Sequence, residues 1–534
     1  MRSAALFDSA MAGLQSAQAG MMVTSQNVTG SSIDGYVRRT SNPRINGMSP
    51  TSIDLTGTSF AVEGFSRYFD NLLQGQVLSQ QSKTTYTQTL VQAVAPLDAM
   101  LTDPATSVAA ALGNFFNAAG SIANEPSNTA YQQSLIGTAR QVADRIRGMA
   151  DVVGQITTNA SKALADVLNQ ANTLTPQLAS VNAKIRASAT PGLAYPSADL
   201  LDERDRIVAK LQELVGGTTL INEDGTASYI VSGQHLVDRE IANTFANSTG
   251  TTPVRSDQPL TSLTLKVASQ NSRNPVLVPI VLNQVQQRDS NGAPLVDGNG
   301  NSLMLPGQSL LQDGKAGAYV HLIQTFVPSV QKTVNLLAAQ LVRQVNSVSG
   351  TGGAITPIFG FKSTASGAPP ITSGVLLNNL FKPTGTGADL SYADIVEASN
   401  PQSSHYKTSV ETNLTRPELD ASLFTTVGTF DTSQFTNLDA TAASSIESLR
   451  QSFSTPLTFI TSSIATTVAT WKNDNKANEA LQKTLNEQKS AITGVNLDEE
   501  AANLVKYQQL YNASSKLMQT GRQMFDTLLG MLSS

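Results

Sequence analysis

The sequence predicts a multidomain α plus β protein. We expect an N- and C-terminal α-helical coiled-coil domain, a helical bundle-like middle domain, and inserted β-rich domains. Apolar residues recur every three or four positions at both chain ends and through most of the first 215 residues, which is the period of an amphipathic helix. Between residues 217 and 310, apolar and polar residues alternate instead, as in strands. A chain of 534 residues is long enough for about three or four domains.

The N-terminal segment is predicted to form one amphipathic helix that ends near Gly30, where breaker residues begin. Its apolar stripe is narrow and rich in small residues, so the helix needs a partner helix to cover that face. The large side chains of the stripe are those of Leu6, Phe7, Met11, Leu14 and Met21.

The C-terminal segment supplies a matching stripe. Its seam follows alternating four- and three-residue steps through Leu497, Ala501, Leu504, Gln508, Tyr511, Ser515, Met518, Arg522, Phe525, Leu529 and Leu532. A seam that continues for about five heptads predicts a coiled coil. Asn496 is expected to cap this helix. We predict an assembly interface made of the five large residues of the first stripe together with Leu497, Leu504, Tyr511, Met518, Phe525 and Leu529.

Helices are also predicted through the middle of the chain. One ends at Asp103-Pro104, the next ends before Asn124, a very long one runs from Tyr131 toward Ile185, and another runs from Leu200 to Val215. Helical spacing returns from Val320 to Val345, and from Ile446 to Trp471 on the way to the C-terminal heptads.

Changes in pattern set the predicted domain boundaries. The terminal helical coiled-coil domain comprises residues 1–65 with 495–534, and the mainly helical domain comprises 66–216 with 311–349 and 436–494. Residues 217–310 form a β-rich inserted domain with turn signals at 222–225, 289–292 and 297–300. Residues 350–435 form a second insert rich in Gly, Pro and Thr.

Composition excludes several kinds of function. The net charge of −5 argues against a nucleic-acid partner, which would require a basic surface. The absence of Cys excludes disulfides, thiolate catalysis and Cys-based zinc sites, and a three-His metal site would need His235, His321 and His405 to converge. No apolar stretch reaches the about 18 residues that a membrane-spanning helix needs, and residues 1–8 lack the apolar core of a signal peptide.

No motif for catalysis, cofactor binding or metal binding stands out, so we expect no enzyme and no cofactor. The densest charge cluster, residues 199–206, is interpreted as a solvated helix face on which Asp202 and Arg206 pair at i,i+4 rather than as an acid–base site. Residues 297–301 are interpreted as a hairpin turn rather than a calcium loop, since the bidentate acid of such a loop is lacking.

Motifs at both ends resemble the bacterial flagellar rod, hook and hook-associated axial protein family. The N-terminal motifs are residues 13–18, 25–28 and 34–39, and the C-terminal motif runs through residues 494–511. The signature residues are Asn27, Gly35, Tyr36, Arg38, Asn496, Glu499, Glu500 and Asn503. Residues 98–104, 114–118, 124–127 and 199–205 narrow the resemblance to the hook-associated members of the first hook–filament junction.

The resemblance implies a structural flagellar subunit that forms the junction between hook and filament and self-assembles into a ring through its terminal helices. It implies copies of the same chain, the hook protein, the second hook–filament junction protein and an export chaperone at the C-terminal segment as partners. It also implies an extracellular protein exported by the flagellar type III system without a cleaved signal peptide. The alternatives are another axial protein, such as a hook or distal rod subunit, or an axial protein that carries an enzymatic or adhesive insert.

Overall fold

The computed structural model describes most of the helical parts of the chain. It describes residues 2–33, 35–46, 59–103, 107–188, 197–247, 254–255, 263–267, 276–280, 285–286, 304–305, 309–331, 333–334, 337, 341, 345, 359–360, 375–376, 382–383, 414–415 and 440–532. Within these ranges, no helix combines the length and the apolar character needed to cross a membrane.

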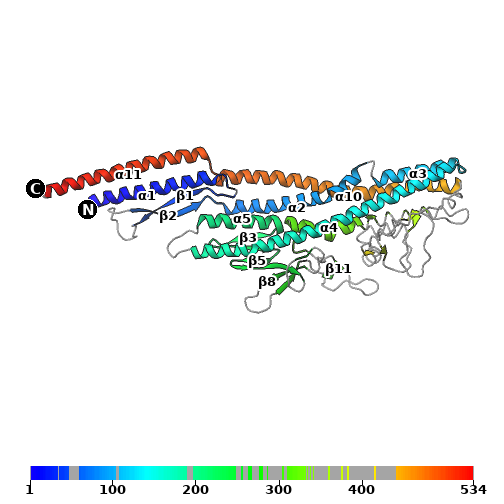
Figure 1. Ribbon diagram of the computed structural model, residues 1–534, viewed down its shortest axis with the longest axis horizontal. Coiled ribbons are helices and arrows are strands. Elements are labelled where there is room, and N and C mark those ends of the chain that lie inside the picture. Colours follow the sequence, from blue (N-terminus) through cyan, green and yellow to red (C-terminus); the bar gives the residue numbers. More distant parts are fainter. Residues whose placement is uncertain are drawn as a thin grey trace, which may run out of the picture.

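The molecule is elongated and mostly helical, and both chain ends lie at one end of its long axis (Figure 1). The helices are α1 (Arg2–Gly30), α2 (Asn71–Thr102), α3 (Val108–Asn124), α4 (Thr129–Ser188), α5 (Ala198–Val215), α6 (Gly314–His321), α10 (Ala440–Thr493) and α11 (Leu497–Leu532). The predicted helices of residues 1–215 and of 446–532 are confirmed, including the end of the first one at Gly30, whereas the helix predicted from Val320 to Val345 is described continuously only as far as residue 331. The helix at α6 continues through a π-helical turn, Leu322–Phe326.

Helix ends follow local capping chemistry. The Asp70 carboxylate accepts the Leu72 N–H at 2.9 Å and so begins α2. The Asn496 side chain accepts the Asp498 N–H at 3.0 Å, which confirms the predicted cap of α11. A short break at residues 494–496 therefore separates α10 from α11 and lets the last helix change direction.

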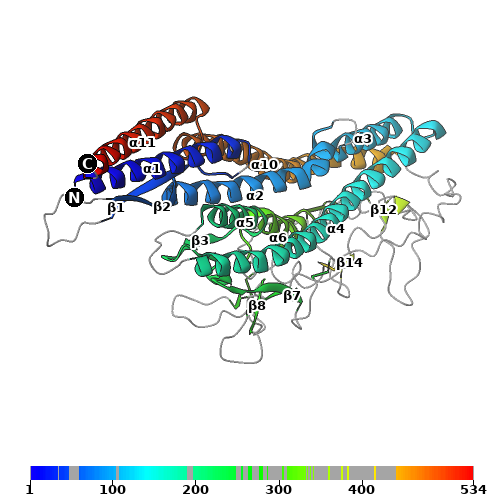
Figure 2. The same cartoon turned by 60° about the vertical axis from the view of Figure 1, so that its left-hand side comes forward.

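The two terminal helices, α1 and α11, lie side by side, as both views show (Figure 1, Figure 2). A β-hairpin of β1 (Arg39–Asn46) and β2 (Ser59–Arg67) follows α1 and packs against it. The sequence alone predicts no strand in this segment. The pairing is irregular between Ser41 and Pro43, and proline cannot donate a ladder hydrogen bond, so the usual strand signal is weak here.

Small antiparallel sheets lie beside α4 and α5. One sheet has the order β3 (Thr218–Ile221), β4 (Ala227–Val231), β5 (Gln234–Asp238), β6 (Ile241–Ala242), and the other has the order β7 (Thr244–Asn247), β8 (Leu263–Val267), β9 (Val276–Pro279). Two-residue strands follow as β10 (Val285–Gln286), β11 (Met304–Leu305), β12 (Phe359–Gly360), β13 (Val375–Leu376), β14 (Lys382–Pro383) and β15 (Leu414–Thr415).

The structure therefore tests the predictions for the β-rich parts only in part. The expected turn at 222–225 is present, with the Gly225 N–H donating to the Asn222 carbonyl at 3.0 Å. The other two predicted turns, at 289–292 and 297–300, and most of the second insert lie outside the described residues. The status of both inserts as separate domains stays a prediction.

Two apolar cores lie one after the other along α4. The first joins α2, α3, α4, α6 and α10, and its largest side chains include Phe115, Phe116 and Phe453. The second joins α4 and α5 to the sheets around Tyr229 and Phe245. Since α4 contributes to both cores, it fixes the helical part and the β-rich part in one body.

Candidate functional site

A network of hydrogen bonds and ion pairs joins the two ends of the chain. We call the set Asn27, Tyr36, Arg38, Glu499 and Glu500 the terminal clasp. The Asn27 amide donates to Glu500 Oε1 at 3.1 Å, and the Tyr36 hydroxyl donates to Asn27 Oδ1 at 2.9 Å. Arg38 donates through Nε to Glu500 at 2.9 Å and through Nη2 to Glu499 at 2.6 Å. Residues more than 450 positions apart in the sequence thus form one network.

Local backbone geometry places each member of the clasp. After α1 ends, Gly35 has φ of +80°, a left-handed conformation that glycine adopts without strain, and the chain then turns Tyr36 back toward Asn27. The Asn496 cap places Glu499 and Glu500 in the first turn of α11, where the helix dipole favours carboxylates. Asn503 lies half-buried one turn later.

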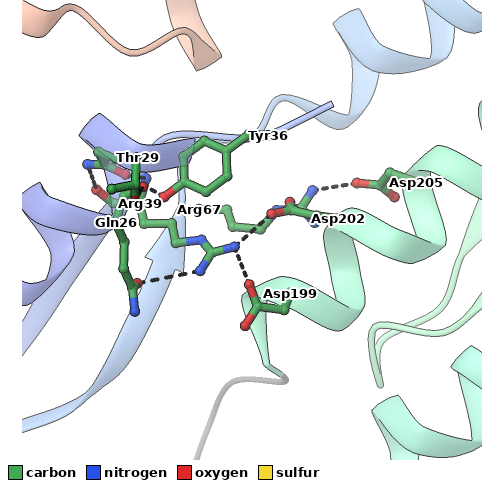
Figure 3. Close-up of polar contacts among 9 residues, drawn as sticks. Gln26, Thr29, Tyr36, Arg39, Arg67, Asp199, Asp202 and Asp205 are labelled. Atoms are coloured by element: carbon green, nitrogen blue, oxygen red, sulfur yellow. Dashed lines mark hydrogen bonds and ion pairs between the residues drawn. The ribbon is translucent and has the colours of Figure 1, made fainter. Parts of the chain in front are cut away.

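A second network links the hairpin to α5. We call Arg39, Arg67, Asp199, Asp202 and Asp205 the α5 network; Figure 3 shows both arginines directed at the aspartates of this helix. Arg39 Nη2 lies 2.6 Å from Asp199 and 2.9 Å from Asp202. Arg67 pairs with Asp202 at 3.1 Å and with Asp205 at 2.5 Å. The network therefore holds the terminal hairpin against the body of the molecule.

Burial dominates the electrostatics of this region. It raises the pKa of Asp202, while the nearby guanidinium groups of Arg67 and Arg39 oppose that increase. Burial also raises the pKa of Tyr36 to about 12. The hydrogen bond from Arg38 to Glu499 raises the pKa of Arg38. Each carboxylate of the clasp and of the α5 network lies within ion-pair distance of an arginine, an arrangement that suits a structural joint.

The α5 network corrects the interpretation of residues 199–206 as a solvated face. Asp202 is largely buried, and its partners are Arg39 and Arg67 rather than the expected Arg206. Sequence reasoning missed both arginines because each lies more than 130 residues from its aspartates. The one available signal is that Arg39 directly follows the signature residue Arg38.

The two terminal helices approach closely through small residues. An ideal Cβ on Gly13 would lie 2.3 Å from Ser514 Oγ, and one on Gly20 would lie 2.4 Å from the Tyr507 ring. The buried line of α11 thus runs through Glu500, Ser514 and Gly521. It runs one residue before the predicted seam positions Gln508 and Arg522, which are exposed.

The predicted interface residues divide into covered and open positions. Phe7, Leu14, Met21, Leu504 and Met518 are half-buried. Met11, Leu497, Tyr511 and Phe525 are exposed in the single chain. Leu6 and Leu529 lie on α1 and α11, and their side chains lie outside the described residues. In the parts of the chain that the structure describes, no group of three metal-ligating side chains occurs.

Comparison with known proteins finds similarity to flagellar proteins in the middle and at the C-terminal segment of the chain. Residues 94–278 match the family described as flagellar hook-associated protein FlgK helical domain, and residues 490–531 match flagellar basal body rod FlgEFG protein C-terminal. The flagellar hook-associated protein 1 of Salmonella typhimurium is 23% identical over 98% of this chain and 99% of that protein. The protein of the same name from Escherichia coli K12 is 21% identical over the same shares.

Two further similarities cover less of the chain. The flagellar hook-associated protein 1 of Bacillus subtilis is 22% identical over 46% of this chain and 53% of that protein. A solved structure, that of the flagellar hook junction protein FlgK from Burkholderia pseudomallei, is 22% identical with a TM-score of 0.38, covering 52% of this chain and 44% of that chain.

Proposed function

We propose that the chain is a flagellar hook-associated protein and a structural subunit of the bacterial flagellum at the junction between hook and filament. One observation carries the proposal: the signature residues of the two chain ends meet in the terminal clasp. Asn27 and Arg38 bind Glu500, so the resemblance at each end describes one structural unit.

We propose that copies of the chain form a ring through their terminal helices. The open positions Leu497, Tyr511 and Phe525 on α11 support this, because large apolar side chains left exposed on a helix favour burial against a further surface. The division into a terminal coiled-coil domain, a helical domain and two inserts remains part of this proposal.

The remaining partners follow from the resemblance to hook-associated proteins. We propose contacts with the hook protein and the second junction protein, a chaperone that binds the C-terminal segment, and export by the flagellar type III system without a cleaved signal peptide. On this proposal, the chain is an extracellular structural protein rather than an enzyme. The ion pairs that connect α1 and its hairpin to α11 and α5 support a structural role for this region.

Electron microscopy of a deletion strain tests the junction role. Loss of a junction protein is expected to leave hooks without filaments and flagellin shed into the medium. Absent hooks would contradict the proposal and favour a hook or distal rod subunit. Normal filaments on normal hooks would contradict both the junction role and the alternative of a hook or distal rod subunit.

Substitution of two apolar positions of α11, the exposed Phe525 and the half-buried Leu504, tests the assembly surface. Phe525→Asp and Leu504→Asp each place a carboxylate where an apolar contact is proposed, which costs several kcal/mol on burial. Incorporation into flagella, measured by immunoblot of the isolated organelles, is expected to fall by more than about tenfold. Gln509→Asp is the matched control, since Gln509 lies on the exposed side of α11. Full incorporation of the first two variants would show that α11 is not the assembly surface.

A further inference from the structure

The contact between α2 and α10, which lie side by side in Figure 1, changes in chemistry along its length. At Leu90, Val94 and Leu97, α2 contributes fully buried apolar side chains to the first core. Earlier in α2 the buried side chains are polar instead: Gln80 is 6% exposed and Thr87 is 7% exposed. Buried polar groups require hydrogen-bond partners, and α10 supplies them here.

Two asparagines of α10 pair with these two residues. The Gln80 amide donates to the side-chain Oδ1 of Asn478 at 3.0 Å and to its main-chain carbonyl at 3.2 Å. The Thr87 hydroxyl lies 3.1 Å from Asn475 Oδ1 and accepts from Asn478 Nδ2 at 3.4 Å. The Asn475 amide donates to Glu479 at 2.8 Å, which fixes the orientation of its Oδ1 toward α2. We call the following four residues the polar seam: Gln80, Thr87, Asn475 and Asn478.

Apolar residues bound the polar seam on the same face of α2. Val77 precedes Gln80 by three positions, and Leu90 and Val94 follow Thr87 by three and seven positions, so helical spacing keeps them in line. All three apolar side chains are buried. Sliding α10 by one turn in either direction would therefore move an amide of α10 from a polar partner to an apolar side chain. A buried amide without a hydrogen bond is strongly disfavoured, which opposes both shifts.

The register of α10 also decides whether the ends of the chain can meet. The Arg38 N–H donates to the carbonyl of Thr493, at the end of α10, at 2.9 Å, and the Arg38 side chain binds Glu500 just beyond it. Since α10 is one continuous helix from the polar seam to Thr493, a shift by one turn carries Thr493 about 5.4 Å along the helix axis. That displacement breaks the hydrogen bond from Arg38 and moves the start of α11 with it.

We propose that the polar seam is a register lock: its hydrogen bonds select the one axial position of α10 on α2 at which the terminal clasp closes. The four seam residues are positioning residues, because they act on the clasp through the register of the helix. Polar residues on an otherwise apolar helix seam select one register at some cost in stability. The inference concerns the folding of a single chain and does not depend on the proposed function.

Thiol cross-linking of the purified full chain measures the register, since the chain has 0 Cys and introduced thiols have no competitors. The native register is reported by Asp98→Cys with Lys472→Cys, because these two residues form an ion pair at 2.6 Å. Shifted registers are reported by Asp98→Cys with Ala469→Cys or with Lys476→Cys, exposed positions about one turn to either side. A short bifunctional thiol reagent joins each pair. Every reporter lacks the ion pair of Asp98, so the seam is tested against one background.

The seam is then replaced by apolar residues. The apolar-seam variant removes the hydrogen bonds with side chains of similar size: Gln80→Met, Thr87→Val, Asn475→Leu and Asn478→Leu. With the native seam, the initial rate of the native-register cross-link is expected to exceed each shifted one by at least about tenfold, the effect of one unpaired buried amide. In the apolar-seam variant this ratio is expected to fall below about threefold. Thr484→Leu, on the exposed side of α10, is the control and is expected to keep the native ratio.

An amide exchange separates hydrogen bonding from shape. Gln80→Asn with Asn478→Gln keeps both amide groups and is expected to retain the native ratio. A ratio as low as that of the apolar-seam variant would overturn the inference, because side-chain shape would then set the register. An unchanged ratio in the apolar-seam variant would overturn it as well. Loss of its cooperative melting, measured by circular dichroism, would do the same, since the seam would then be needed for stability rather than for register.

Hydrogen exchange tests the link to the terminal clasp. In the apolar-seam variant without added thiols, only chains in the native register close the clasp. Amides of α1 and of the first turns of α11 are therefore expected to exchange at least about threefold faster than in Thr484→Leu. Equal exchange in the two variants, together with a lowered cross-linking ratio, would show that the clasp closes at several registers and would overturn the inference.

Discussion

Two adjacent arginines connect three parts of the molecule. Arg38 binds Glu499 and Glu500 at the start of α11, whereas Arg39 binds Asp199 and Asp202 on α5. Successive side chains of an extended chain point to opposite sides, so neighbouring residues can serve different partners. Each guanidinium also lies over an aromatic ring, Arg38 at 5.3 Å from Tyr68 and Arg39 at 4.8 Å from Tyr36. Residues 38 and 39, where β1 begins, therefore connect the terminal helices to the rest of the molecule.

Glu500 and Glu499 provide a matched test of the clasp. Glu500 is 2% exposed and accepts from Asn27 and Arg38, whereas Glu499 is 52% exposed. Glu500→Ala leaves the buried donors unpaired and is expected to weaken the pairing of α1 with α11 by about 3 kcal/mol. Glu499→Ala is expected to cost about 1 kcal/mol or less. Hydrogen exchange of peptides from α1 and α11 measures both, and equal effects of the two variants would contradict the assigned roles.

At the scale of the elements, local patterns predict the helices well. Leu112, Phe115 and Phe116 on α3 repeat at helical spacing, and all three are buried in the first core. Asn496 likewise predicts where α11 begins, because its side chain caps that helix. The sequence cannot reveal the hairpin as readily, because Pro43 interrupts its first strand. The pairing of Arg39 with Asp202 depends on tertiary folding and has no local signal.

The contacts of the terminal clasp likewise depend on tertiary folding and have no local signal in the sequence. Asn27 and Glu500 are identified by resemblance at each end of the chain, while their direct hydrogen bond is a product of the fold. The heptad pattern of α11 finds Leu504 and Met518, which are half-buried. It does not distinguish the line facing α1, since Ser514 and Gly521 are small and carry little hydropathy signal.

The meeting point of α2, α6 and α10 contains a titratable group. His321 Nδ1 lies 2.9 Å from the Tyr86 hydroxyl, and its ring lies edge-on to Trp471 with centroids 5.7 Å apart. Burial lowers the pKa of His321 below its usual 6.5. As pH falls below 6.5, the unfolded chain binds a proton that the folded chain does not, so stability falls with pH in this window.

This contact predicts a pH-dependent stability of the helical body. Between about pH 7.5 and about pH 5.5, the apparent thermal midpoint of the wild-type chain is expected to decrease, and His321→Gln is expected to reduce that decrease. His235→Gln is the control, because His235 is exposed on β5. Circular dichroism melts at both pH values measure the change. An unchanged slope in His321→Gln would show that another group carries the acid sensitivity.

At the scale of the whole molecule, the long helices set the shape. The 60 residues of α4 span about 90 Å at 1.5 Å per residue, and α10 with 54 residues is nearly as long. The two cores lie in sequence along α4, and α1 with α11 extends the molecule further (Figure 1). Such a layout transmits force along one axis, which suits a subunit of a long appendage.

Solution scattering tests this shape. A compact protein of 534 residues would have a radius of gyration of about 24 Å. The elongated arrangement predicts a clearly larger value for the purified full chain at low concentration. The same measurement over a dilution series controls for association. A concentration-independent value near that of a compact protein would contradict the arrangement of the helices.

The tip of the molecule is formed by α1 and α11, so it can close only in a chain that includes α11. Residues 2–30 pack against residues 497–532 as well as against the hairpin of β1 and β2. A chain that stops short of residue 497 therefore leaves the small-residue face of α1 without its partner and Asn27 without Glu500. The closed tip is therefore expected to be absent from truncated chains.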